Sequence, residues 1–158
     1  MDLLFKLYLS RAENELNLAG IIYRLSLNKD MQITIFKVKP DTYFSAVISH
    51  AYYCIFYSAK AYLLAKGIKT YSPGEHKMTF NEFKKLVEQG TVDRELLKIY
   101  EDILIKADAL LDIFGKEKTK RGRFTYKKLP QANEEPANKS IERAKIFFKH
   151  LYNLCELK

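Results

Sequence analysis

The chain is poor in cysteine, with two in 158 residues. Cys54 and Cys155 fall inside predicted helices, and neither has a CxxC motif or a Cys/His partner nearby in the sequence. This pattern excludes a disulfide framework and a zinc-finger-like site. It indicates two structural free thiols in a reducing compartment.

The sequence motifs of common catalytic and nucleotide-binding sites are also missing. No nucleophile elbow, Walker-type loop or dinucleotide glycine fingerprint is present. No two helices carry the inward Glu-x-x-His pairs of a di-iron bundle. We therefore expect no cofactor and no metal. The N-terminus lacks the layered composition of a secretion signal, so a cytoplasmic protein is expected.

A membrane-spanning segment is not expected either. The longest apolar run, roughly Tyr43 to Ala65, approaches membrane-spanning length. It contains Lys60, His50, three serines and five tyrosines. A helix buried among other helices is apolar on all sides, which explains the run without a bilayer.

Helical periodicity dominates what is present. Residues 4–26 repeat apolar and small side chains at steps of three and four, as expected for an amphipathic helix. Asp41 is the predicted N-cap of a second helix that runs to Lys66 and stops at Gly67. Its stripe uses only small or medium side chains: Val47, Ala51, Cys54, Ser58, Ala61 and Ala65.

Three more helices follow. Ser72, Pro73 and Glu75 form a predicted capping box for a short helix that ends near Gly90. Asp93 is the predicted cap of the next helix and Asn133 that of the last. Residues 32–39 are assigned to a linker, because a single strand would have nothing to pair with.

These elements predict one domain over residues 1–158. Four long helices, one short helix and brief connections indicate an all-α, antiparallel up-and-down four-helix bundle with one extra short helix. With 47% hydrophobic residues, the chain can bury one substantial core.

The positive charge of the chain, +8 overall, is concentrated in one segment. Residues 116–128 hold seven basic side chains and one acidic one, a net charge of +6. Phe124 and Tyr126 are interleaved with these cations, a combination suited to binding phosphates and stacking bases. The alternative is a solvated loop held by acids of the preceding helix: Glu101, Asp108 and Asp112.

The three histidines give little indication of function by themselves. His50 lies in the predicted central helix, where a packed, hydrogen-bonded histidine is the default expectation. His76 is expected to be exposed in the first turn of the short helix. His150 falls near the end of the last helix, where a positive charge suits the helix dipole.

Residues 10–155, taken together, resemble the HEPN family of compact prokaryotic and archaeal helical domains. The segment from Ser45 to Gly67 is similar to the family's second helix, which typically contains Ala-Tyr-Tyr-x-x-Phe-x-x-Ala. His76 resembles a histidine common in the next segment of the family. The Arg-x4-Tyr element from Arg121 to Tyr126 is similar to one found late in many members.

The resemblance implies a function as well as a fold. HEPN domains often form homodimers that bring their arginine motifs together in a shared cleft. Many are metal-independent endoribonucleases, including toxins paired with a minimal nucleotidyltransferase antitoxin, and others only bind RNA or nucleotides. Active members carry histidine where Tyr126 stands here, and a phenol is a poor base near neutral pH.

We therefore expect a HEPN-type module that binds RNA or a nucleotide and works with a nucleotidyltransferase in a toxin–antitoxin-like system. Arg121 and Tyr126 are the candidate catalytic residues if any nuclease activity is retained. The expected ligand-binding residues are Arg121, Arg123, Tyr126, Lys127, Lys128, His50, Tyr53 and His76. The alternatives are an active metal-independent ribonuclease toxin, with His50 or His76 as base, and a non-catalytic protein-interaction bundle.

Overall fold

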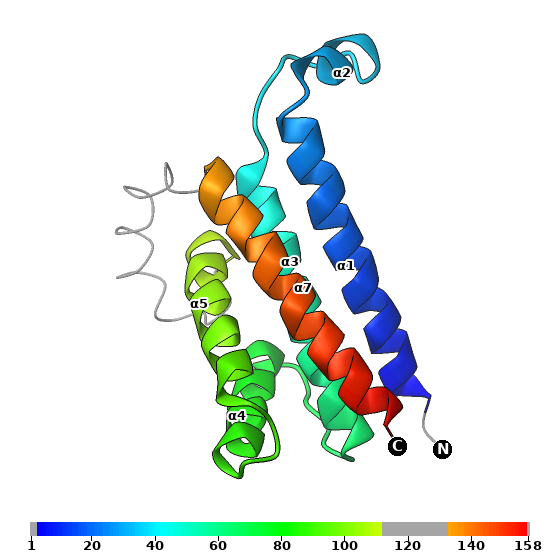
Figure 1. The fold of residues 1–158 in the computed structure, drawn as a ribbon, viewed down its shortest axis with the longest axis vertical. Coiled ribbons are helices and arrows are strands. Elements are labelled where there is room, and N and C mark those ends of the chain that lie inside the picture. Colours follow the sequence, from blue (N-terminus) through cyan, green and yellow to red (C-terminus); the bar gives the residue numbers. More distant parts are fainter. Residues whose placement is uncertain (1–2, 112–132, 158) are drawn as a thin grey trace.

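The computed structural model describes residues 3–111 and 133–157. In this part of the chain the structure is entirely helical, with six helices and no strand, which confirms the all-α prediction. Successive long helices run in alternating directions, so that α1, α3, α5 and α7 form a bundle (Figure 1). In chain order the helices are α1 (Leu4–Ser26), α2 (Lys29–Thr34), α3 (Phe44–Ala65), α4 (Glu75–Glu88), α5 (Arg94–Leu111) and α7 (Glu134–Glu156).

Helix α3 is the centre of the bundle, since it packs against α1, α4, α5 and α7. All six residues of its predicted small-residue stripe are buried. Tyr52 and Ile55 on other sides of the helix are fully buried too, which explains its continuous apolar sequence. No helix in the described part of the chain is long and apolar enough to cross a membrane.

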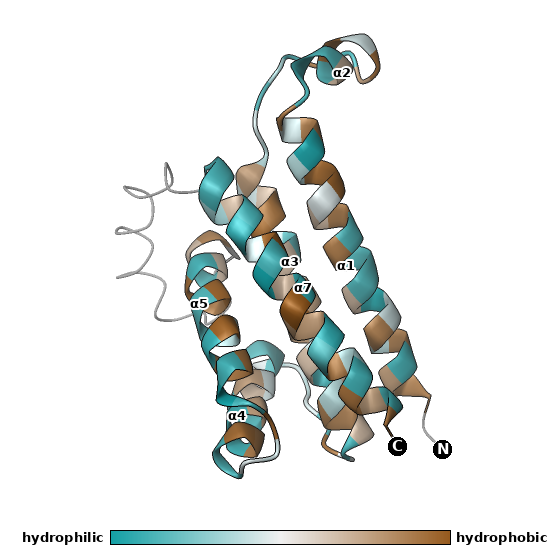
Figure 2. Cartoon of the chain, in the orientation of Figure 1, coloured by the Kyte–Doolittle hydropathy of each residue, from teal (hydrophilic) through white to brown (hydrophobic). Residues whose placement is uncertain are grey.

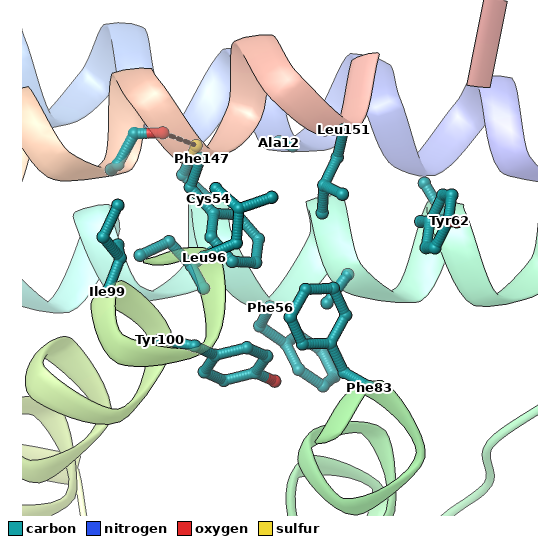
Figure 3. Packing of buried hydrophobic residues seen from close by; sticks show 14 of the residues in the cluster. Ala12, Cys54, Phe56, Tyr62, Phe83, Leu96, Ile99, Tyr100, Phe147 and Leu151 are labelled. Atoms are coloured by element: carbon teal, nitrogen blue, oxygen red, sulfur yellow. Dashed lines mark hydrogen bonds between the residues drawn. The ribbon is translucent and has the colours of Figure 1, made fainter. Parts of the chain in front are cut away.

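Three aromatic rings, one from each helix, join α4, α5 and α7 (Figure 3). The Phe83 ring lies 5.6 Å from that of Tyr100 and 5.4 Å from that of Phe147, between ring centroids. The Tyr100 hydroxyl is buried without a hydrogen-bond partner among the described residues, and burial raises its pKa. Apolar packing therefore holds the cluster together. Its one polar atom, the Tyr100 hydroxyl oxygen, is buried without a hydrogen bond and so reduces the stability of the folded state.

Two helix ends agree with the sequence patterns. Gly67 follows α3 with φ of +79°, the left-handed conformation that a glycine adopts without strain. The backbone N–H of Glu95 donates to Asp93 Oδ1 at 2.9 Å, which confirms Asp93 as the cap of α5. Asn133 occupies the N-cap position of α7, but its side chain makes no capping hydrogen bond.

Two predicted caps are wrong. Helix α3 begins at Phe44 rather than after Asp41, whose side chain accepts from the N–H of Thr42 instead. Helix α4 begins at Glu75, preceded by Gly74 with φ of +79°, and has no side-chain cap. The expected capping box does not form: Ser72 lies two residues before the N-cap position, and the Glu75 carboxylate pairs with Lys60 of α3 instead.

Residues 27–43 form a projecting arm at one end of the bundle (Figure 1). The linker prediction is wrong for its first part, because α2 is a short helix whose Met31 N–H donates to the Asn28 side chain. The fully buried Gln32 holds the arm in place. Its amide nitrogen donates to the carbonyls of Leu25 and Asp41 at 2.8 and 3.0 Å. Its amide oxygen accepts the N–H of Asp41 at 2.8 Å.

Candidate functional site

The predicted site residues divide into two groups. Arg121, Arg123, Tyr126, Lys127 and Lys128 lie outside the described residues. His50 and Tyr53 lie on α3, and His76 lies in the first turn of α4, so these three can be placed.

His76 lies against the Ala-Tyr-Tyr segment of α3. Its Nδ1 is 2.8 Å from the Tyr52 hydroxyl, and its ring stacks on Phe56 with centroids 4.1 Å apart. The Tyr53 ring meets it edge-on at 5.9 Å. Two of the predicted ligand-binding residues, Tyr53 and His76, are therefore in contact. His76 is half-buried rather than exposed, because the short helix packs its first turn on α3.

The environment of His76 favours its neutral form. Burial lowers the pKa of His76, and the nearby Lys60 charge lowers it further. Burial raises the pKa of Tyr52, so that its phenol keeps its proton. A protonated phenol beside a neutral imidazole can donate to Nδ1, which leaves the imidazole proton on Nε2.

We expect the lowered pKa of His76 to make the stability of the protein depend on pH. Below pH 6.5 the unfolded chain binds a proton at this residue before the folded protein does. The free energy of unfolding should therefore fall as the pH decreases through this range. Urea unfolding at several pH values would measure the slope of the free energy of unfolding against pH. The slope should decrease in His76→Gln and persist in the control His150→Gln; equal slopes in all three proteins would contradict the assignment.

Lys60 and Glu75 form an ion pair beside this histidine contact, because Glu75 directly precedes His76 and Lys60 lies one turn after Phe56. Lys60 is only 8% exposed, and its Nζ also lies 3.5 Å from the Thr70 carbonyl and 4.9 Å from the Tyr8 ring centroid. Burial lowers the pKa of Lys60, and the charge of Arg11 adds to this effect. The Glu75 carboxylate compensates the buried charge and attaches the start of α4 to α3.

Two further polar contacts join α3 to α1. His50 Nδ1 lies 2.5 Å from Glu15 Oε2, and both side chains are about one-quarter exposed, at 28% and 23%. Arg11 donates to the Tyr57 hydroxyl at 2.8 Å, and its guanidinium lies 4.4 Å from the centroid of that ring. His50 is thus hydrogen-bonded, as expected from its position in the central helix, although its partner is an acidic side chain of α1.

A separate group of cations lies between α5 and α7. Burial lowers the pKa of Lys106, and the charges of Lys139 and Arg143 lower it further. Asp102 opposes this shift, and it accepts a hydrogen bond from Arg143 at 2.6 Å. Two cations of α7 and one carboxylate of α5 therefore act electrostatically on Lys106. We call Asp102, Lys106, Lys139 and Arg143 the α5–α7 basic cluster.

The α5–α7 basic cluster is next to the basic segment in the sequence. Helix α5 ends at Leu111 and α7 begins at Glu134, so residues 116–128 belong to the connection between these two helices. Lys106 is five positions before the end of α5, and Lys139 is five positions after the start of α7. This cluster was not predicted, because no local sequence pattern shows which cations of two helices will meet.

Comparisons of the chain with protein-family models, with curated proteins and with solved structures found no match. Within residues 3–111 and 133–157, no group of three or more histidine, cysteine, aspartate or glutamate side chains could hold a metal ion. Cys54 and Cys155 are both buried and are not joined by a disulfide, in agreement with two structural thiols.

Proposed function

We propose that this protein is a HEPN-type module that binds RNA or a nucleotide through its phosphates. The observation that carries the proposal is the α5–α7 basic cluster, in which Arg143 binds Asp102 and the charges of Lys139 and Arg143 act on the partly buried Lys106. The like charges of Lys106, Lys139 and Arg143 repel one another, and a bound polyanion would relieve the repulsion. The connection between the same two helices contains a further net charge of +6.

The residue types near these charges suit RNA better than a simple anion. Phe124 and Tyr126 stand among the cations of the basic segment and could stack on unpaired bases. Arg121 and Arg123 provide planar guanidinium groups that can contact a phosphate through two hydrogen bonds. The order of the motifs along the chain, with Ala-Tyr-Tyr in α3 and Arg-x4-Tyr after α5, supports the same function through the HEPN resemblance.

We expect neutralising the cluster to weaken binding of a labelled single-stranded RNA in a salt-dependent way. The variant carries Lys106→Gln, Lys139→Gln and Arg143→Gln, and fluorescence anisotropy measures its affinity over a series of salt concentrations. Each lost phosphate contact on a single strand should reduce the slope of log K against log salt by about 0.7, so the triple variant should lose about 2.

The matched control removes the same charge elsewhere, with Lys6→Gln, Lys77→Gln and Lys84→Gln, which are all exposed. An equal loss of affinity in the control would show general attraction to a basic protein rather than a site. A second variant, Arg121→Ala with Arg123→Ala, tests the basic segment. Unchanged affinity for RNA and nucleotides at low salt in both test variants would sink the proposal.

A metal-independent ribonuclease is a second candidate, favoured by the contact between His50 and Glu15. The carboxylate orients the imidazole through Nδ1 and leaves Nε2 as a proton acceptor. An imidazole so placed could take the proton of a 2′-hydroxyl as its oxygen attacks the phosphorus, while a donor protonates the leaving 5′-oxygen. RNA cleavage in the presence of a chelator, abolished by His50→Gln or Arg121→Ala, would favour this candidate over binding alone.

The proposed partners follow from the HEPN resemblance. A minimal nucleotidyltransferase would be the protein partner, as in toxin–antitoxin pairs of this family, and a second copy of the chain would complete a homodimer. Co-expression with a neighbouring nucleotidyltransferase gene, followed by purification of the complex, is the direct test of the first partner.

A further inference from the structure

The first turn of α4 is attached to the bundle by two side chains. Of residues 71–78, six are exposed, and Glu75 and His76 are the two that are partly buried. The Glu75 carboxylate pairs with Lys60 of α3, and the His76 ring stacks on Phe56 of the same helix. An ion pair and a titratable ring therefore hold this part of the chain on α3.

The rest of α4 is held mainly by buried side chains. They begin one turn later and are Thr79, Phe83, Leu86 and Val87. Figure 2 shows the contrast, with hydrophilic residues at the start of α4 and hydrophobic residues recurring along the rest of the helix. Gly74, directly before the helix, has φ of +79°, and a glycine changes its backbone angles more easily than any other residue. The first turn can therefore move while the end of the helix stays packed.

The contact between His76 and Tyr52 requires a neutral imidazole. The Tyr52 hydroxyl donates to Nδ1 at 2.8 Å, and a protonated imidazole has no nitrogen left to accept a hydrogen bond. The Tyr52 hydroxyl has no other hydrogen-bond partner within residues 3–111 and 133–157, and Tyr53 meets the His76 ring only edge-on. Protonation would therefore leave a buried phenol O–H without its acceptor, which destabilises the attached arrangement.

The charges around His76 also oppose its protonation. Lys60 of α3 is the cation that acts on this histidine, and Arg11 of α1 acts in turn on Lys60. On α4 itself, the Glu75 carboxylate is engaged by Lys60, and Lys77 is exposed. A proton on His76 would therefore add a further positive charge beside cations that are already present.

The attached arrangement leaves one more polar group unsatisfied. The Tyr100 hydroxyl of α5 has no partner among the described residues, and α4 covers it with Phe80 and Phe83, whose rings contact that of Tyr100. Figure 3 shows the hydroxyl end of Tyr100 directed toward Phe83. Tyr100 and Asp108 of α5 act electrostatically on Tyr52, so the two hydroxyls lie in one region. Water that entered when the first turn moved could bind both hydroxyls, which favours the movement.

We propose that the first turn of α4, from Glu75 to Met78, detaches from α3 when His76 becomes protonated, while the rest of the helix stays in place. Detachment would uncover the part of α3 around Tyr52 and Phe56 at acid pH. In the detached form His76 has the ordinary histidine pKa of 6.5, whereas burial and Lys60 lower the pKa of His76 in the attached form. Below pH 6.5 the detached form therefore binds the proton more readily. Its share should rise by up to about tenfold per pH unit, until the pH falls below the lowered pKa.

Hydrogen exchange followed by mass spectrometry tests the movement. The Met78 N–H donates to the Gly74 carbonyl at 2.9 Å, and the next amides of the helix bond back into the first turn in the same way. With labelling times corrected for the intrinsic pH dependence of exchange, residues 78–81 should exchange up to about tenfold faster for each pH unit below 6.5. Residues 84–88, at the other end of the same helix, should not change. Equal acceleration in both segments would indicate unfolding of the whole helix and would overturn the inference.

Two substitutions test the role of the histidine. His76→Gln keeps an acceptor for Tyr52 but does not titrate, so residues 78–81 should exchange slowly across this pH range. Lys60→Met removes one of the two causes that lower the pKa of His76, so the total acceleration should be smaller and should level off at a higher pH. The control His150→Gln changes an exposed histidine and should behave like the native protein. Circular dichroism verifies that all three variants are folded.

The outcomes that would overturn the inference differ between the variants. They are an acceleration that persists in His76→Gln, one that disappears in His150→Gln, and one that is as large in Lys60→Met as in the native protein. None of these residues belongs to the α5–α7 basic cluster, so this inference and the proposed function can fail separately.

Discussion

Replacing Phe83 by alanine is expected to lower the free energy of unfolding by about 3–5 kcal/mol, a large part of the total stability of a domain this size. The Phe83 side chain is fully buried and packs on Tyr100 of α5 and Phe147 of α7. The three rings come from different helices, so the neighbours cannot collapse into the cavity without moving a whole helix (Figure 3). Urea unfolding followed by circular dichroism measures the effect.

Phe80 provides the matched control for this substitution. It lies on the same helix and also contacts Tyr100, with ring centroids 5.0 Å apart, but it is only partly buried. Phe80→Ala should therefore cost clearly less than Phe83→Ala. Equal losses, or a loss below about 1 kcal/mol for Phe83→Ala, would show that these rings do not hold α4 in place.

Removing the acidic partner of Lys60 should cause the second largest decrease in the free energy of unfolding. Glu75→Gln leaves the buried ammonium group with a neutral amide, and hydrogen bonds to charged groups contribute roughly 1.5–3 kcal/mol. Lys60→Met should cost less, because it removes the buried charge and keeps most of the apolar stem. The two variants and their combination form a double-mutant cycle, with unfolding free energies measured in urea.

A surface pair on the same helix serves as the reference for this cycle. Glu82 and Lys85 are 3.0 Å apart, and the lysine side chain is 63% exposed. Pairs of this kind contribute only about 0.2–0.5 kcal/mol. A coupling energy for Lys60 and Glu75 no larger than that of the surface pair would mean that α4 is held mainly by its apolar residues.

The sequence predicted the helices well because their evidence is local. The buried stripe of α3, its glycine stop and the Asp93 cap each depend on residues within one or two turns. The caps at Asp41 and Ser72 failed for a tertiary reason. Gln32 binds the backbone of Asp41, and Lys60 takes the carboxylate that a capping box needs. A local motif is lost when a distant side chain offers a stronger partner.

The candidate site was predictable only in part. His50, Tyr53 and His76 stood out by residue type, and the structure brings the last two together. The partner of His50 on α1 and the partners of Lys106 on α7 were missed, because periodicity gives the face of a helix but not its register against a neighbour. The binding role of these residues, and that of the basic segment, stays a prediction.

The arm is attached to the bundle through the side chain of Gln32, and the main hydrophobic core contains no residue of the arm. One amide group satisfies three backbone groups of the arm and the end of α1. The helices of the main core have no need of that amide, since their cohesion comes from apolar packing. Loops of a different length or sequence should therefore be able to replace residues 33–40 without loss of the bundle, provided that the glutamine is kept.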